Sequence, residues 1–457
     1  MEKIKNNNRI LILLFIGVLM GALDISIVGP AIPSIEKTIK VTGHDLSWIF
    51  SIYVLFNLVG ISFMAKMSDL LGRRWIYIAA VSIFAIGSLV VSVAHDINLL
   101  LIGRAIQGLG SSGIFPVATA VIGDVFPVEK RGRALGLIGA VFGIAFILGP
   151  FIAGFMLMYF DWNSLFLINI PIAIPLIFFA WHLLPGKKTG VKPHMDWEGM
   201  IMMGIILTSF TLALNNIDTK NLAESLGSWS VLPFLLIVAL LTPLLLMLEK
   251  NQPEPILNLK LFNSTEIRLV GFIAFGLGLF QANIVFLPKL AVDQFGVDPS
   301  RASFMLLPVV LATAIGSPLV GRLLDRIGSR IIINTGLIIS SLALFLLGLL
   351  TKNTIVFYTA EGLLGLGLSM RASLNYIMLN EAPAKERAST QGVLLIFISV
   401  GQLAGAALIG AIASSTPGHT QGYGYSFMSM TGLAVILVVM SFFLKGRKRE
   451  LEGNTSR

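Results

Sequence analysis

Long apolar stretches, separated by short polar loops, recur along the whole of this 457-residue chain. A helix needs about 20 mostly apolar residues to cross the hydrocarbon core of a bilayer, and by that criterion about fourteen stretches qualify as spans. Charged residues make up only 12% of the chain, against about 25% in soluble domains. The sequence therefore predicts an all-α polytopic membrane protein. The predicted spans lie near residues 10–30, 46–65, 75–94, 97–121, 134–157, 165–184, 198–214, 229–248, 268–290, 302–321, 331–350, 354–378, 388–412 and 425–444.

The basic residues are distributed unevenly between the two sides of such a protein. If both termini are cytoplasmic, that side carries 25 of the 33 lysine and arginine residues, and the other side carries six. The remaining two, Arg104 and Arg371, fall within spans. This asymmetry follows the positive-inside rule, so we predict a multi-pass protein of the cell membrane with both termini in the cytoplasm. The net charge of +9 is then a consequence of topology, and we expect no nucleic-acid partner.

Two parts of the sequence occur twice at one fixed spacing. Residues 65–74 resemble residues 321–330, and residues 131–154 resemble residues 387–410, in both cases 256 positions further along. A repeat this long exceeds any solenoid unit and predicts two homologous, pseudo-symmetric halves of six spans each, with two additional spans between them. The expected domains are an N-terminal six-helix bundle at 1–184, a two-helix insertion with flanking cytoplasmic loops at 185–267, and a C-terminal six-helix bundle with a basic tail at 268–457.

The first repeated segment combines an acid, a glycine and basic residues in a predicted cytoplasmic loop. Its residues are Asp69, Gly72, Arg73 and Arg74 in the first copy and Asp325, Arg326, Gly328 and Arg330 in the second. They resemble the loop signature of the major facilitator superfamily, although Ala65 and Leu70 depart from it. The resemblance implies gating loops that lock neighbouring helices, and such ion pairs can bias an alternating-access equilibrium. The alternative is that the arginines only hold their loop inside.

Other stretches extend this resemblance over nearly the whole chain. Residues 101–110 resemble the fourth-helix signature, whose buried arginine, here Arg104, is associated with proton coupling. In the fifth span, glycines permit close packing and bending, and the pattern resembles a signature found mainly in exporters. That pattern consists of Gly136, Gly149, Pro150 and Gly154. Three stretches resemble the fourteen-helix drug:proton antiporter branch: residues 23–33, 162–171 and 196–199. The second of them departs from the pattern at Asn163 and Ser164.

Charged residues inside spans are costly and usually functional. Asp24 lies in the first span and Glu361 in the twelfth, and a desolvated carboxyl group can bind and release a proton near neutral pH. We therefore predict that Asp24 and Glu361 carry protons, with Arg104 as the coupling partner. The repeat further predicts that Arg104 and Glu361 face one water-filled cavity. The alternatives are a solvated Asp24 at the outer mouth, an Asp24 that caps a helix break near Gly29 and Pro30, and a structural ion pair between Arg104 and some other polar residue.

Further polar side chains within the spans are candidates for the lining of a substrate cavity. For four of them, helix–helix hydrogen bonds worth about 1 kcal/mol are an equally good explanation: Asn57, Gln107, Gln281 and Asn283. The charge of Arg371 could instead extend to the cytoplasmic end of its helix. The candidate residues are Asn57, Gln107, Gln281, Asn283, Arg371 and Asn375.

Several classes of function find no support in the sequence. The chain has no cysteine and five scattered histidines without metal-ligand spacing, and it shows no Walker loop. We therefore expect no enzyme, no metal site and no cofactor. The favoured hypothesis is a monomeric secondary transporter in the bilayer that exports an amphipathic organic compound in exchange for protons.

Two other hypotheses remain open at this point. The same fold could move an organic anion or a lipid-like substrate, with Arg104, Arg371 and Lys289 as the binding charges. The chain could also be a membrane sensor or scaffold that binds a ligand without transport, although the repeated gating loops argue against it.

Overall fold

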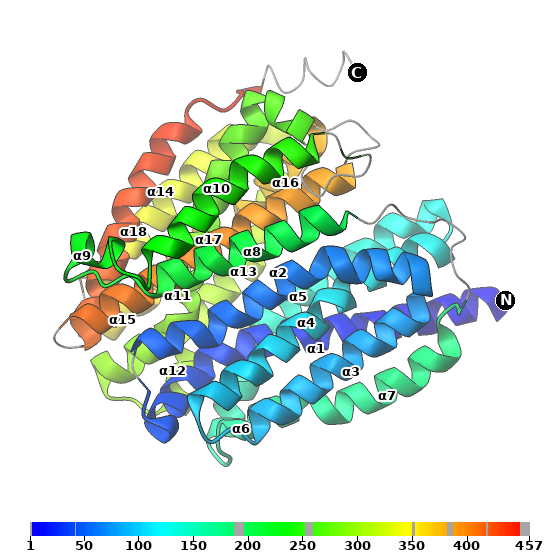
Figure 1. Cartoon of the computed structure of the whole chain (residues 1–457), viewed down its shortest axis with the longest axis horizontal. Coiled ribbons are helices and arrows are strands. Elements are labelled where there is room, and N and C mark those ends of the chain that lie inside the picture. Colours follow the sequence, from blue (N-terminus) through cyan, green and yellow to red (C-terminus); the bar gives the residue numbers. More distant parts are fainter. Residues whose placement is uncertain are drawn as a thin grey trace. The chain divides into compact units, whose positions relative to one another are not determined.

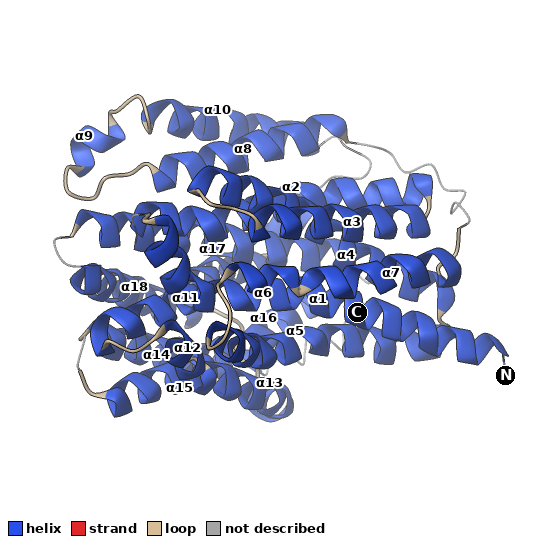
Figure 2. Ribbon diagram, turned by 90° about the horizontal axis from the view of Figure 1, so that it is seen from below, coloured by secondary structure: helices blue, strands red, loops and turns tan. Residues whose placement is uncertain are grey.

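Helices make up the described part of the chain, as a computed structural model shows (Figure 1). The structure describes residues 2–41, 43–186, 196–250, 252, 259–349, 352–381, 387–416 and 419–447. Within these ranges, Figure 2 shows helices joined by loops and no strand. The prediction of an all-α fold is therefore confirmed for the described residues.

The chain divides into two compact units. Unit 1 comprises Met1–Val41 and Trp48–Gly204, and unit 2 comprises Thr42–Ser47 and Ile205–Arg457. Up to the boundary within α8, the helices are α1 (Glu2–Ile39), α2 (Gly43–Leu71), α3 (Arg73–Ser92), α4 (Ile97–Val125), α5 (Val128–Leu157), α6 (Asn163–Leu167), α7 (Asn169–Leu183) and α8 (Trp197–Asn215). Beyond it they are α9 (Leu222–Leu226), α10 (Leu232–Glu249), a 3-10 turn (Leu259–Asn263), α11 (Thr265–Phe295), α12 (Pro299–Met305), α13 (Leu307–Ile327), α14 (Ser329–Gly348), α15 (Thr354–Leu368), α16 (Arg371–Glu381), α17 (Arg387–Ser415) and α18 (His419–Ser441).

The two units use the same pairs of helices to build their interiors. In unit 1, α1 packs against α5, and α3 packs against α4 and α7. In unit 2, α11 packs against α17, and α14 packs against α15 and α18. The 256-residue shift places the start of α3 on the start of α14, and α5 on α17. The repeat in the sequence is therefore matched by a repeat in the packing.

Twelve helices of the described residues are long and apolar enough to cross a bilayer. Two of the predicted spans are not among them. The span predicted over 134–157 falls on α5, in which Val141–Leu157 is a shorter apolar helix. The span predicted over 354–378 divides into α15 and α16, because Ser369 and Met370 form a turn between these helices. The count of fourteen spans therefore stays a prediction.

Each copy of the repeated loop changes the chain direction at one glycine. Gly72 separates α2 from α3 and has φ 101°, while Gly328 separates α13 from α14 and has φ 84°. A side chain disfavours this part of backbone space, whereas glycine enters it freely. The two turns are equivalent positions of the repeat, so both units need a glycine there for the same backbone reason.

Close contact between α3 and α4 depends on glycines in both helices. A Cβ atom added to Gly110 would lie 2.4 Å from the backbone nitrogen of Phe84, and one added to Gly87 would lie 2.5 Å from that of Gln107. Glycine at such positions lets two helix backbones approach closely in a membrane. The close approach of α3 and α4 also places Ser88, next to Gly87, within hydrogen-bonding distance of Gln107. Ser88 and Gln107 both belong to the candidate functional site.

Alanine at Gly110 is expected to lower the free energy of unfolding by about 1–3 kcal/mol, because the methyl group has no room against the backbone of α3. Gly123 is a matched control in the same helix, since a Cβ atom there has no neighbour within 4 Å. Alanine at Gly123 should be neutral or slightly stabilising, because alanine favours the helix. Unfolding midpoints of the purified proteins in detergent measure both effects. Equal losses at the two positions would contradict the proposed contact.

Candidate functional site: a buried ion pair in unit 1

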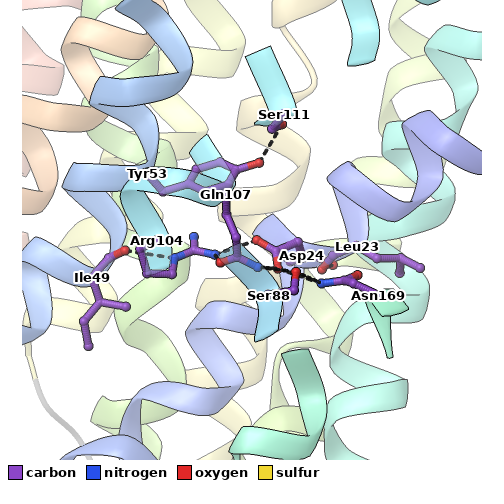
Figure 3. Close-up of polar contacts among 10 residues, drawn as sticks. Leu23, Asp24, Ile49, Tyr53, Ser88, Arg104, Gln107, Ser111 and Asn169 are labelled. Carbon is purple, nitrogen blue, oxygen red and sulfur yellow. Dashed lines mark hydrogen bonds and ion pairs between the residues drawn. The ribbon is translucent and has the colours of Figure 1, made fainter. Parts of the chain in front are cut away.

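A cluster of buried polar side chains lies inside unit 1, where five helices contribute to it. Figure 3 shows Asp24 of α1, Tyr53 of α2, Ser88 of α3, Arg104 and Gln107 of α4, and Asn169 of α7. Asp24, Arg104 and Gln107 each have 0% of their surface exposed. Polar groups buried this deeply need partners within the protein, because their transfer from water is otherwise costly.

Asp24 and Arg104 form an ion pair at the centre of this cluster. Nη1 of Arg104 lies 2.5 Å from Oδ2 of Asp24. Nε of Arg104 donates a hydrogen bond to the carbonyl oxygen of Ile49 in α2 at 3.2 Å. The pair therefore links α1, α2 and α4.

The second oxygen of Asp24 is held by two amides. Oδ1 accepts hydrogen bonds from Nε2 of Gln107 at 2.9 Å and from Nδ2 of Asn169 at 3.2 Å. Both amide nitrogens also donate to Oγ of Ser88, at 2.8 and 3.1 Å. The amide oxygen of Gln107 accepts from Nη1 of Arg104 at 2.8 Å. Asp24 is thus fixed by donors from α4 and α7, and Ser88 joins those donors from α3.

Aromatic rings cover the charge of Arg104. Its guanidinium carbon lies 4.3 Å from the centre of the Tyr53 ring and 5.8 Å from that of Phe166, within the range of cation–π attraction. The hydroxyl of Tyr53 donates to Oγ of Ser111 at 2.8 Å. Among the described residues, Nη2 of Arg104 and Oδ1 of Asn169 have no hydrogen-bond partner. The site therefore surrounds the carboxyl group of Asp24 with hydrogen-bond donors and the guanidinium of Arg104 with aromatic rings.

A second ionic cluster surrounds the turn between α2 and α3. Arg73 lies 2.5 Å from Asp69 and 2.9 Å from Asp124, measured from Nη1 and Nε to the carboxylate oxygens. Nε of Arg74 donates to the carbonyl oxygen of Leu184 at 2.7 Å. Arg73 thereby joins the end of α2 and the end of α4, and Arg74 holds α3 to the end of α7.

The second copy of the loop lies in unit 2 between α13 and α14. The side chain of Asp325 is outside the described part of the structure; Arg326 is exposed and Arg330 is half-buried. At the end of α16, Glu381 forms an ion pair with Lys445, which follows α18. The end of α16 therefore carries an ion pair of its own, as the end of α4 does in unit 1.

The structure brings three predicted residues together: Asp24, Arg104 and Gln107. Asp24 is fully buried in a helix that continues through Gly29 and Pro30, so the alternatives of a solvated side chain and of a cap at a helix break are both wrong. The expectation that Arg104 and Glu361 share one cavity stays a prediction.

Three further members of the cluster, Tyr53, Ser88 and Asn169, were not predicted as site residues. Hydroxyl and amide groups are common in membrane spans, so Tyr53 and Ser88 carried no distinguishing signal. Asn169 lies within residues 162–171, the stretch that resembles the antiporter branch. That resemblance was the sequence feature that could have identified Asn169 as a site residue.

Glu361 and Arg371 lie on either side of the break between α15 and α16 in unit 2. Glu361 has 0% of its surface exposed, and neither of its carboxyl oxygens has a hydrogen-bond partner among the described residues. Arg371 is the first residue of α16 and is half-buried. Unlike Asp24, Glu361 is therefore a buried acid to which no described residue donates a hydrogen bond.

The remaining cavity candidates differ in their surroundings. Nδ2 of Asn283 donates to the carbonyl oxygen of Leu279 at 3.1 Å and contacts the sulfur of Met430 at 2.9 Å, so its amide joins α11 to α18. Asn57 and Asn375 are half-buried. Gln281 is half-buried and bonded to Gln402. Their role in lining a cavity stays a prediction.

The glycine–proline pattern of the fifth span lies in α5. A Cβ atom on Gly149 would lie 1.9 Å from Oγ of Ser26 in α1, so the two helices touch at this glycine. Pro150 and Gly154 are buried in the same helix. The surroundings of Gly136 are outside the described part of the structure. A bending role for this segment stays a prediction.

The sequence profile of the Major Facilitator Superfamily matches residues 14–248 and 268–457. The chain therefore belongs to the major facilitator superfamily, whose members are membrane transporters and not enzymes. The predicted resemblance is confirmed. Within the described residues, no group of three or more histidine, aspartate or glutamate side chains is arranged to hold a metal ion.

Relatives and a solved structure agree with this assignment. An uncharacterized MFS-type transporter, YfiU of Bacillus subtilis strain 168, is 32% identical over 393 residues, which cover 84% of this chain and 76% of YfiU. The multidrug transporter protein MdtP of the same strain is 29% identical over 427 residues, or 91% of this chain and 77% of MdtP. The crystal structure of the nucleoside transporter NupG superposes with a TM-score of 0.66 at 14% identity, covering 96% of this chain and 100% of NupG. The likeness to NupG shows the shared fold alone, whereas MdtP supports the drug-efflux branch.

Proposed function

We propose that this chain exports amphipathic organic compounds in exchange for protons, by alternating access, as a monomer in the cell membrane with both termini cytoplasmic. The proposal rests mainly on the buried ion pair between Asp24 and Arg104, since charges inside membrane spans mark ion and substrate pathways. The name of the relative MdtP, a multidrug transporter, supports an organic compound as the cargo. In this proposal α8 and α10 form an insertion between two six-helix bundles.

Asp24 is proposed to couple the proton to the conformational change. A proton can shift an equilibrium between two conformations only if they differ in their affinity for it. In the described network, Asp24 accepts from Arg104, Gln107 and Asn169. A proton on Asp24 removes the ionic part of these bonds and leaves the charge of Arg104 uncompensated. Proton binding therefore favours a different arrangement of α1, α4 and α7.

Glu361 is proposed as a second proton carrier. Its carboxyl group is buried and has no hydrogen-bond donor in the described part of the chain, and an ionised carboxylate in such a place is far more costly than a neutral one. In this conformation Asp24 is suited to the charged form and Glu361 to the neutral form. Acids held in opposite states allow one conformational change to load one site and release the other.

The ionic cluster of Arg73 is proposed as a conformational lock. Arg73 pairs with both Asp69 and Asp124, so separation of α2 from α4 would break one of these pairs. Ion pairs made in only one conformation bias a two-state equilibrium. The second copy of the loop, Asp325 to Arg330, is proposed to act in the same way.

Transport of an organic anion is the second candidate function. Arg371 is the observation in its favour, because it is a half-buried cation at the start of α16. Two other candidate cations have their charges compensated: Arg104 pairs with Asp24, and Lys289 pairs with Asp293. Of the three cations first considered, Arg371 is therefore the one to test with organic anions.

Proton flux in sealed proteoliposomes tests the proposed function. With an imposed pH gradient, lipophilic cations such as tetraphenylphosphonium should drive proton movement in the natural protein. Asp24→Asn should reduce this movement to the level of protein-free vesicles. Asp96→Asn is the matched control, because Asp96 is an exposed N-cap of α4 outside the network and asparagine caps helices equally well.

Two outcomes would contradict the proposal. One is full proton coupling in Asp24→Asn, which would remove Asp24 from the mechanism. The other is movement that depends only on organic anions and is lost in Arg371→Ala, which would favour the second candidate function.

A further inference from the structure

Helices α11 and α17 in unit 2 pack backbone against backbone at two glycines. A Cβ atom on Gly278 would lie 2.0 Å from the carbonyl oxygen of Ile398, and one on Gly401 would lie 2.0 Å from that of Phe275. The two backbones therefore touch, and glycine is required at both positions. Side chains beside this contact, which we call the α11–α17 seam, are held at a fixed spacing.

Two glutamines bridge the seam next to these glycines. Nε2 of Gln402 donates to Oε1 of Gln281 at 2.9 Å. Each amide has a carbonyl group and an NH₂ group, so a single bond between them uses one carbonyl and one N–H. Whichever way the amides are turned, one carbonyl group and one NH₂ group are left over. Both side chains are half-buried, and neither leftover group is among the buried polar atoms that lack a hydrogen-bond partner in the described residues.

The leftover groups cannot be satisfied by lipid. Hydrocarbon offers no hydrogen bonds, so polar groups in a span face protein, water or cargo. Within residues 276–291 of α11, all of which are described, only Gln281 and Ile284 are not buried, and they lie one turn apart. On α17, Ser399 lies one turn before Gln402 and is also half-buried. The half-buried side chains beside the seam therefore combine amide, hydroxyl and apolar groups.

We propose that the Gln281–Gln402 pair recognises a neutral amide-like edge on the cargo. This inference rests on the proposed function and adds one chemical feature by which some of the cargo is recognised. A lactam, imide or primary amide presents an N–H donor beside a carbonyl acceptor. That edge is complementary to the carbonyl and the NH₂ that the bridge leaves over. The pair carries no charge, so it selects compounds by this hydrogen-bonding edge, while the neighbouring Ile284 accommodates an apolar ring.

Equilibrium binding of two matched compounds tests the inference. 2-Quinolone carries a lactam edge, and 2-methoxyquinoline has nearly the same shape but no N–H donor. The purified full-length protein in nanodiscs should bind 2-quinolone about tenfold more tightly, because a site built to hydrogen-bond a donor discriminates against the analogue that lacks it. Gln281→Met and Gln402→Met should each abolish this preference while they keep side-chain length.

Gln391→Met is the matched control. Gln391 lies in α17, as Gln402 does, and its amide donates to the backbone carbonyl of Asn375 at 3.2 Å. Loss of the Gln391 amide should therefore leave the preference for 2-quinolone unchanged. The inference is overturned if the natural protein binds both compounds equally or binds neither, or if the preference survives in Gln281→Met and Gln402→Met. Binding is measured without a pH gradient. Failure of proton coupling in vesicles would therefore count against the proposed function, and failure of this preference against the inference alone.

Discussion

Asp24→Asn is expected to lower the free energy of unfolding by about 3–5 kcal/mol, although aspartate and asparagine have nearly the same size. In the described residues, Asp24 is the acid that pairs with Arg104, and both side chains are fully buried. Asparagine can still accept a hydrogen bond, but it cannot neutralise the guanidinium. The penalty therefore comes from an uncompensated buried charge and not from a lost contact.

The double variant Asp24→Asn/Arg104→Gln should recover most of this loss. With both charges removed, only polar groups remain, and a buried ion pair replaced as a whole is far less costly than one that is broken. Free energies of unfolding of the four proteins in this double-mutant cycle give the coupling energy. A double variant less stable than Asp24→Asn would show that the charge of Arg104 is not the source of the penalty. The recovered protein should still lack proton-driven flux.

The helices of this fold could be predicted from the sequence because membrane spans depend on length and apolar content, which are local properties. The turns at Gly72 and Gly328 were also visible, since each lies in a repeated motif of acid, glycine and base. The break between α15 and α16 was not. The apolar run continues through Ser369 and Met370, so a criterion based on length alone joins the two helices.

The candidate site was predictable residue by residue but not as an assembly. Asp24 and Arg104 were identified separately, because an ionisable side chain in a span is costly wherever it points. Their pairing depends on how α1 packs against α4, and no local pattern encodes that distance. The repeat instead related Arg104 to Glu361, whereas the ion pair that the structure shows joins Arg104 to Asp24. Symmetry between the halves predicted that Arg104 lies at a similar depth in the membrane to Glu361, but it did not predict which residue pairs with Arg104.

Glu361→Met is expected to change stability in the opposite direction from Asp24→Asn. The carboxyl group of Glu361 is buried without a hydrogen-bond partner among the described residues, and burial of such a group costs about 1–3 kcal/mol on protein scales. Methionine has a similar length and no polar group to desolvate, so the variant should gain stability of this order. The same variant should lose proton-driven accumulation of the cargo, because it removes a proposed proton carrier.

A gain in stability together with a loss of proton coupling would identify Glu361 as a residue that is required for transport although it destabilises the folded protein. The matched control is Glu381→Met in the same unit. Because Glu381 pairs with the partly exposed Lys445, this variant should lose about 0–1 kcal/mol. Unfolding midpoints and proton flux measured on both variants separate the two effects. If Glu361→Met instead lost as much stability as Asp24→Asn, Glu361 would be a charged and paired acid, and its proposed role as the carrier that is neutral in this conformation would be wrong.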